Sequence, residues 1–142
     1  MAPPWPHLVL ACAVLALAVV VSACGTDDGS PPVPSDGPVI ATFQVAGGER
    51  FRVLLTDPAD ITNANRLVAG EDAPSIPSGV VVRGVTSVNE GYSWSLDPAQ
   101  FEFADVTMEV CDGLPSDVEA AIVTSDRYCP WSAIIASLDP AD

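Results

Sequence analysis

Lysine is absent from this sequence, and histidine occurs once, as His7 near the N-terminus. Ser-His-Asp and Cys-His catalysis need a histidine beside the nucleophile, and zinc sites that use imidazole need one as a ligand. Schiff-base chemistry and Ser-Lys dyads need a lysine. A phosphate loop of the Walker type also ends on a lysine. These absences exclude most nucleophilic and nucleotide-dependent enzymes, and they favour a protein without catalytic residues.

Positive charge is scarce, because five Arg face 19 Asp and Glu residues and leave a formal net charge of −14. Such a surface repels a polyanion, which excludes nucleic acid as a partner. It attracts a cationic protein or peptide, with an association rate that falls as ionic strength rises. The charge therefore favours a basic partner.

The longest apolar run, residues 8–21, has 14 residues. A stable transmembrane helix needs about 20, whereas the apolar region of a secretory signal has the shorter length. Val-Ser-Ala-Cys-Gly at residues 21–25 resembles the cleavage box of bacterial lipoproteins. The resemblance implies a signal peptide over residues 1–23 and an extracytoplasmic protein held on the cell membrane by lipid on Cys24. The alternative is an ordinary secretory signal and a secreted protein.

Residues 25–38 contain four Pro, three Gly and one apolar side chain, Val33. A segment of this composition buries too little apolar surface to fold, so we expect residues 24–38 to be a disordered spacer. Residues 39–142 have the length of one domain.

Local patterns predict a small α+β domain with about five or six mostly antiparallel strands and two short helices. Alternating apolar residues on either side of Gly47 and Gly48 predict a hairpin of residues 39–46 and 49–55. Asp57 followed by Pro58 is typical of a helix start, and Gly70 of its end. Ser116 and Glu119 have the spacing of a capping box for the second helix. Further strands are expected at residues 80–85, 92–96 and 106–111, with a short extension at 101–103. Residues 132–138 are expected to form the last strand, with an apolar helix as the alternative.

Cys111 and Cys129 remain once the leader is removed and Cys24 is lipidated. Two cysteines in an exported chain are typical of one structural disulfide. A redox pair is the alternative, but the spacing is not Cys-x-x-Cys. We therefore expect a disulfide that stabilises the domain.

Four residues form a candidate binding surface: Arg83, Asn89, Tyr92 and Trp94. Tyr92 and Trp94 share one face of a predicted strand, because alternate residues point the same way. Arg83 stands on an otherwise apolar strand, and Asn89 precedes a turn. Packing in the core is the alternative role for the aromatic pair.

Acidic residues gather between positions 97 and 117, which suggests calcium as a ligand. Asp97, Asp105 and Asp112 are the candidate metal ligands, although no EF-hand loop is present. The alternative is that these carboxylates cap helices and cover the surface. A small hydrolase that uses two carboxylates is a third hypothesis.

Five segments carry a resemblance to a family: residues 39–46 (VIATFQVA), 49–58 (ERFRVLLTDP), 76–84 (IPSGVVVRG), 88–94 (VNEGYSW) and 109–119 (EVCDGLPSDVE). They are similar to the BP-seventy-four N-terminal domain family of small secreted proteins, over residues 39 to about 132. The resemblance implies a small extracytoplasmic α+β domain. It brings no catalytic residues, so it favours a binding role over an enzyme.

The sequence therefore predicts a cell-surface lipoprotein whose non-catalytic domain binds a protein or peptide partner without a cofactor. The membrane is contacted through the lipid only. A calcium-binding module is the alternative, and a carboxylate hydrolase is the third possibility.

Overall fold

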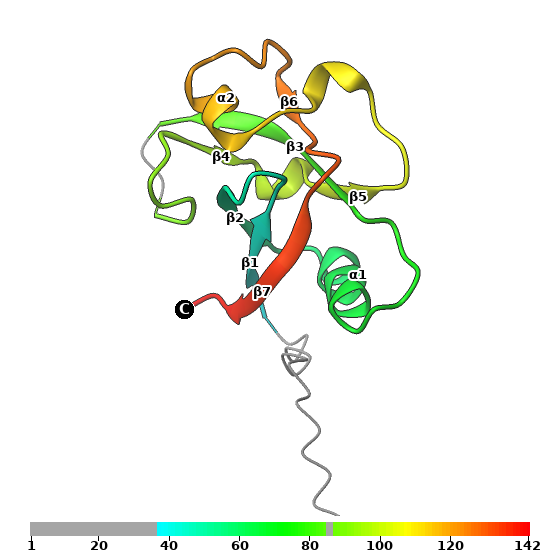
Figure 1. Ribbon diagram of the computed structural model, residues 1–142. Coiled ribbons are helices and arrows are strands. Elements are labelled where there is room, and N and C mark those ends of the chain that lie inside the picture. The colour runs from blue at the N-terminus through cyan, green and yellow to red at the C-terminus, as the bar shows by residue number, and fades with distance from the viewer. Residues whose placement is uncertain (1–36, 85–86) are drawn as a thin grey trace, which may run out of the picture.

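The computed structural model describes residues 37–84 and 87–142. The predicted signal peptide, Cys24 and the spacer up to residue 36 lie outside the described residues. In the described part, two antiparallel sheets and one longer helix enclose a common core (Figure 1). No helix of that part is both long and apolar enough to cross a bilayer.

The first sheet has three strands in the order β2-β1-β7: β1 (Val39–Gln44), β2 (Arg50–Leu55) and β7 (Ile134–Pro140). The predicted hairpin is confirmed, with Phe43 opposite Phe51. Gly47 and Gly48 turn the chain with φ of +89° and +88°, a backbone conformation that residues with a Cβ rarely adopt. The last strand is also confirmed, and it starts later than expected because a turn holds the N–H of Ala133 on the Pro130 carbonyl at 3.2 Å.

The second sheet is built around β3 (Ile76–Arg83), which pairs with β4 (Trp94–Leu96), β5 (Glu102–Ala104) and β6 (Arg127–Tyr128). β3 begins four residues before the predicted position 80, because the Pro- and Gly-containing stretch joins the strand. Pro77 is tolerated there since it pairs with β5 alone. Gly79 allows close packing, because a Cβ at this position would lie 3.1 Å from the Leu96 Cβ and would force that side chain to shift.

Helix α1 (Pro58–Val68) has the predicted ends. The Asp57 carboxylate accepts the N–H of Ala59 at 2.8 Å, and Gly70 follows the helix with φ of +76°. Ile61 and Ala64 are its buried residues, and they pack into the core. Two short 3-10 helices, η1 (Pro98–Gln100) and η2 (Glu109–Cys111), complete the chain between β4 and α2.

The predicted capping box of α2 (Pro115–Glu119) is wrong. The N-cap is Leu114, two residues before Ser116, and the Asp117 carboxylate accepts the N–H of Leu114 at 3.0 Å. Ser116 donates its N–H and hydroxyl to the Glu49 carboxylate at 2.9 and 2.8 Å. The Glu49 carboxylate, from the β1–β2 hairpin, therefore takes the place that the sequence assigned to Glu119 as partner of the Ser116 N–H.

Aromatic rings join the two sheets. Phe51 lies 5.3 Å from Tyr128 and 6.0 Å from Trp94 between ring centroids, and all three side chains are fully buried. The rings of Phe101 and Phe103 pack on Phe43 at 6.4 and 6.1 Å. The α+β class is confirmed; the described chain contains seven strands, of which the two-residue β6 was not predicted.

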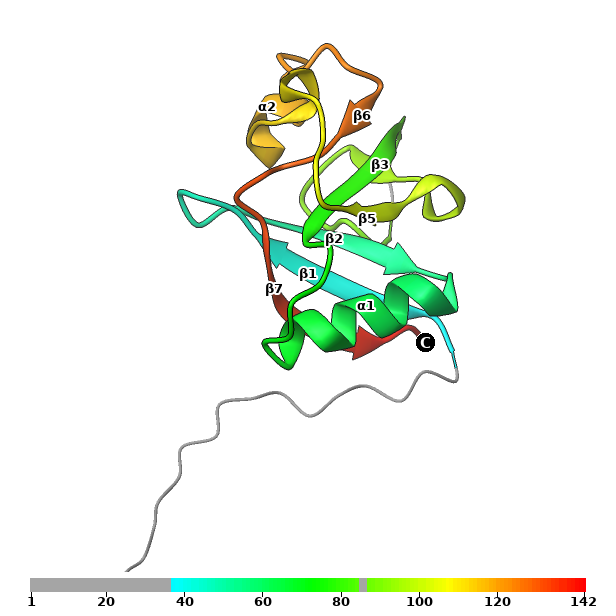
Figure 2. The same ribbon diagram turned by 90° about the vertical axis from the view of Figure 1, so that its right-hand side faces the viewer.

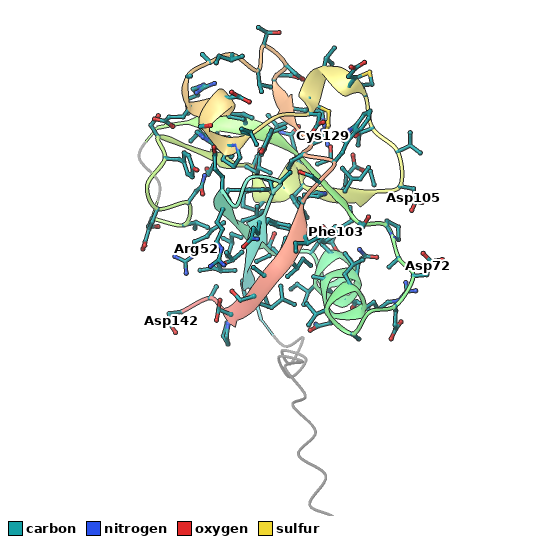
Figure 3. The ribbon with its side chains drawn as sticks, viewed as in Figure 1. Arg52, Asp72, Phe103, Asp105, Cys129 and Asp142 are labelled. Carbon is teal, nitrogen blue, oxygen red and sulfur yellow. A yellow bond between two sulfur atoms is a disulfide. The ribbon has the colours of Figure 1, made fainter. Side chains whose placement is uncertain are left out.

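A backbone hydrogen bond and the disulfide mark opposite ends of the domain. The N–H of Ala141 donates to the Pro38 carbonyl at 2.9 Å, so the chain enters and leaves the fold at one end. The predicted Cys111–Cys129 disulfide is confirmed and lies towards the other end, next to β6 and α2 (Figures 1 and 3).

Candidate interaction surface

Residues 106–111 do not form the predicted strand. β5 ends at Ala104, which pairs with Ile76, the first residue of β3. Beyond this point β3 offers no further residue to pair with. Residues 105–108 continue without a neighbouring strand, and the chain then tightens into η2.

The alternating apolar residues of this segment face solvent instead of the core. Val106, Met108 and Val110 are 83%, 68% and 63% exposed, and Trp131, after the second cysteine, is 49% exposed. We call these four residues the apolar patch. Large apolar side chains gathered at a surface mark interaction sites more often than scattered ones do.

Hydrogen bonds and the disulfide hold the apolar patch in place. The Trp131 indole N–H donates to the Thr107 hydroxyl at 2.6 Å, and the Trp131 backbone N–H donates to the Asp112 carboxylate at 2.9 Å. The N–H of Cys129 donates to the Cys111 carbonyl at 2.7 Å beside the disulfide. A surface fixed before binding loses less conformational entropy when a partner arrives.

Carboxylates border the apolar patch. Asp105 and Glu109 are exposed, and Asp105 lies at the outer margin of the molecule, on the loop that leads from β5 towards Cys129 (Figure 3). No Arg occurs between positions 84 and 126, and the chain has no Lys. The border of the patch is therefore negative.

The four predicted binding residues lie in different environments. Asn89 and Trp94 are fully buried, so neither presents a surface to a partner. The Asn89 amide accepts the N–H of Arg52 and donates to the Trp94 carbonyl, both at 2.9 Å, and thereby joins β2 to β4. Arg83 is exposed and Tyr92 is partly exposed.

The pKa of Tyr92 is raised by partial burial and by the nearby Glu49 carboxylate, to which the phenol donates. Tyr92 therefore remains a neutral hydrogen-bond donor at physiological pH. Its hydrogen bond to Glu49, directly after the Gly47–Gly48 turn, instead fixes the tip of the β1–β2 hairpin.

The three candidate calcium ligands are placed separately. Asp97 caps η1, where the amide of Gln100 and the N–H of Ala99 hold the pKa of its carboxyl below the usual range. Asp112 accepts the N–H of Trp131, and Asp105 points to solvent. Across residues 37–84 and 87–142, no three His, Cys, Asp or Glu side chains converge as a metal site.

The sequence reasoning missed the apolar patch. The pattern of Val106, Met108 and Val110 is that of a half-buried strand, which is what the sequence predicts at residues 106–111. Residues 106–108 stay unpaired because β3 begins at Ile76, and where β3 begins depends on residues far away in the sequence. No local signal distinguishes a buried apolar row from an exposed one.

These features define a small, disulfide-stabilised α+β domain with an exposed apolar patch and an acidic border. The sequence model of the BP-seventy-four N-terminal domain family matches residues 38–141, and the chain belongs to this family. No curated protein and no solved structure matches the chain.

Proposed function

We propose that this chain is a non-catalytic binding protein, held outside the cytoplasm by lipid on Cys24, whose domain binds a basic protein or peptide through the apolar patch. The observation that carries the proposal is the patch itself: four large apolar side chains, 49% to 83% exposed, fixed beside a disulfide. Trp and Met are among the residues enriched at protein interfaces. A buried Trp is also a frequent source of binding energy.

The charge of the chain supports a basic partner. The net charge of −14 and the exposed Asp105 and Glu109 favour Lys and Arg around the contact. Such pairs at the rim of an interface mainly raise the association rate and set specificity. Binding is therefore expected to weaken as salt is added.

The arrangement of the domain also fits an anchored receptor. A tether that joins the domain at Pro38 enters at the lower end in Figures 1 and 2, whereas α2 and β6 lie at the upper end, and Figure 3 places Cys129 of the disulfide near them. A patch beside this disulfide is therefore held away from the point where the tether joins the domain. A partner in the surrounding medium reaches it without crossing the lipid surface.

Site-directed photocrosslinking tests the proposal in the full-length chain on cells. The photoreactive residue p-benzoylphenylalanine replaces Met108 in one variant and Val82, an exposed aliphatic residue of β3, in the control. We expect a protein or peptide adduct at position 108 that weakens with salt and disappears with Trp131→Ser. The same adduct from both positions, or none from position 108, contradicts the proposal.

Calcium binding, the alternative, has no group of ligands among the described residues. Thermal unfolding at matched ionic strength, with and without millimolar calcium, tests it. A ligand at 100 times its Kd stabilises the native state by about 2.7 kcal/mol. That corresponds to a rise in Tm of about ten degrees or more for a domain of this size, and such a rise would favour the calcium function.

A further inference from the structure

The backbone between β5 and η2 is unpaired: it bends at Asp105 and continues through residues 106–108 outside any helix or strand. Met108 has φ of −84° and ψ of 142°, which is β geometry. Within residues 37–84 and 87–142, no group donates to the carbonyls of Val106 or Thr107, and none accepts the N–H of Val106, Thr107 or Met108. These donors and acceptors are left for water or for a partner.

The side chains of the same segment have strand alternation. Val106 and Met108 point to solvent, whereas Thr107 lies between them, partly buried, and holds the Trp131 indole. An unpaired strand with one exposed apolar row is the template that β-strand addition uses: backbone hydrogen bonds supply affinity, and alternate side chains supply specificity.

We infer that residues 105–108 accept an extended, basic segment of the partner as an added strand. The inference rests on the proposed function and specifies its mode. The backbone of the partner pairs with residues 106–108, its apolar side chains cover Val106 and Met108, and its Lys or Arg side chains face Asp105 and Glu109.

Charge decides between a basic partner and a second copy of this chain. Pairing of two copies would bring Asp105 and Glu109 of one copy close to the same residues of the other, and opposed like charges destabilise a strand pair. A net charge of −14 on each copy adds to the repulsion. A segment rich in Lys or Arg turns the same carboxylates into favourable cross-strand pairs.

Hydrogen exchange on the full chain in a non-ionic detergent tests the inference. The probe is a synthetic heptapeptide that alternates valine with lysine or arginine, and the control probe carries glutamate in place of the basic residues. We expect alternate amides within residues 106–108 to exchange at least about tenfold more slowly with the basic probe, because an added strand hydrogen-bonds every second N–H of the segment. The acidic probe should leave them unchanged.

Two matched comparisons separate backbone pairing from charge. N-methylation of every second residue of the basic probe removes the N–H donors along one of its two edges, so two methylated probes cover the two edges. We expect only the probe methylated on the edge that pairs with residues 106–108 to lose binding. Asp105→Asn with Glu109→Gln should weaken binding of the basic probe about tenfold. Asp72→Asn with Asp142→Asn removes the same amount of charge from exposed positions outside the segment (Figure 3) and should change the affinity for the basic probe much less.

Each contrary result has a defined meaning. If the basic probe binds and Met108→Ser weakens it, but exchange at residues 106–108 and binding of both methylated probes are unaffected, strand addition is overturned and the proposed function stands. If the segment becomes protected without probe as protein concentration rises, the occupant is a second copy and the inference is overturned. Failure of crosslinking at position 108 would instead contradict the proposed function.

Discussion

At the scale of single residues, Asp60 has a carboxyl group that folding places in a less favourable setting. Partial burial, and then the neighbouring Asp57 charge, raise its pKa to about 6, although the N–H of Phe103 donates to it. The folded state therefore holds this proton more tightly than the unfolded chain, whose carboxyl has the ordinary pKa of 3.8. Ionisation of Asp60 lowers stability as pH rises between these two values.

Asp60→Asn should consequently raise Tm at pH 7.5 and have little effect at pH 4. The amide keeps an oxygen for the Phe103 N–H but carries no charge to desolvate. Thermal unfolding of both chains from pH 4 to 7.5 measures the difference, with Asp72→Asn as a control for the loss of one surface charge. Equal gains at both pH values would contradict the assignment to Asp60 ionisation.

Asn89 offers a second test at this scale, because the sequence suggested a binding role and the structure gives it a buried position between β2 and β4. Asn89→Ala leaves the Arg52 N–H and the Trp94 carbonyl without their partner. We expect a loss of about 2 to 4 kcal/mol in the free energy of unfolding, since each unsatisfied buried group costs about 1 to 3 kcal/mol. Urea unfolding measures this loss, with Thr62→Ala, at an exposed position, as the control. If Asn89→Ala left stability unchanged but impaired binding of the basic probe, the binding role that the sequence suggested for Asn89 would be supported after all.

At the scale of elements, the disulfide links η2 to the residue that follows β6, over a sequence separation of 18. Replacing Cys111 and Cys129 with Ala should cost about 3 kcal/mol in unfolding free energy, because the unfolded chain gains freedom. The apolar patch should loosen as well, since Trp131 is held beside this link. Urea unfolding followed by tryptophan fluorescence measures stability, and retained binding of the basic probe at full affinity would show that the disulfide does not position the patch.

Elements with local signals were predictable. The β1–β2 hairpin and α1 agree with the sequence because glycine turns, an Asp N-cap and a terminal Gly act within a few residues. The strand predicted at residues 106–111 failed because pairing depends on where β3 begins. The cap of α2 failed because Glu49, 67 residues away, competes for the donors of Ser116.

At the scale of the whole molecule, the proposed lipid anchor on Cys24 can be tested directly. Cys24→Ala in the full-length chain should move the protein from the membrane fraction to the soluble fraction, because stable attachment depends on acyl chains. Fractionation and the mass of the mature N-terminus measure the change. Ser22→Ala is the matched control, and membrane association that survives Cys24→Ala would contradict lipid anchoring.

The candidate site was less predictable than the fold. The acidic character and the disulfide follow from composition and cysteine count, and both border the apolar patch. Which apolar residues reach the surface depends on the packing of both sheets. Trp94 and Trp131 illustrate this: each follows a short polar or proline-containing turn, yet one is fully buried and the other is half exposed.

The strand order of the first sheet has a consequence for folding. β1 is the first strand of the domain and lies in the centre of its sheet, yet its second neighbour, β7, is the last. Contacts between the two ends of a chain form slowly, because a long loop must close before they are gained. If the chain is exported N-terminus first, as the proposed lipid anchor requires, this sheet stays incomplete until β7 has crossed the membrane, and the strand order itself delays folding until then.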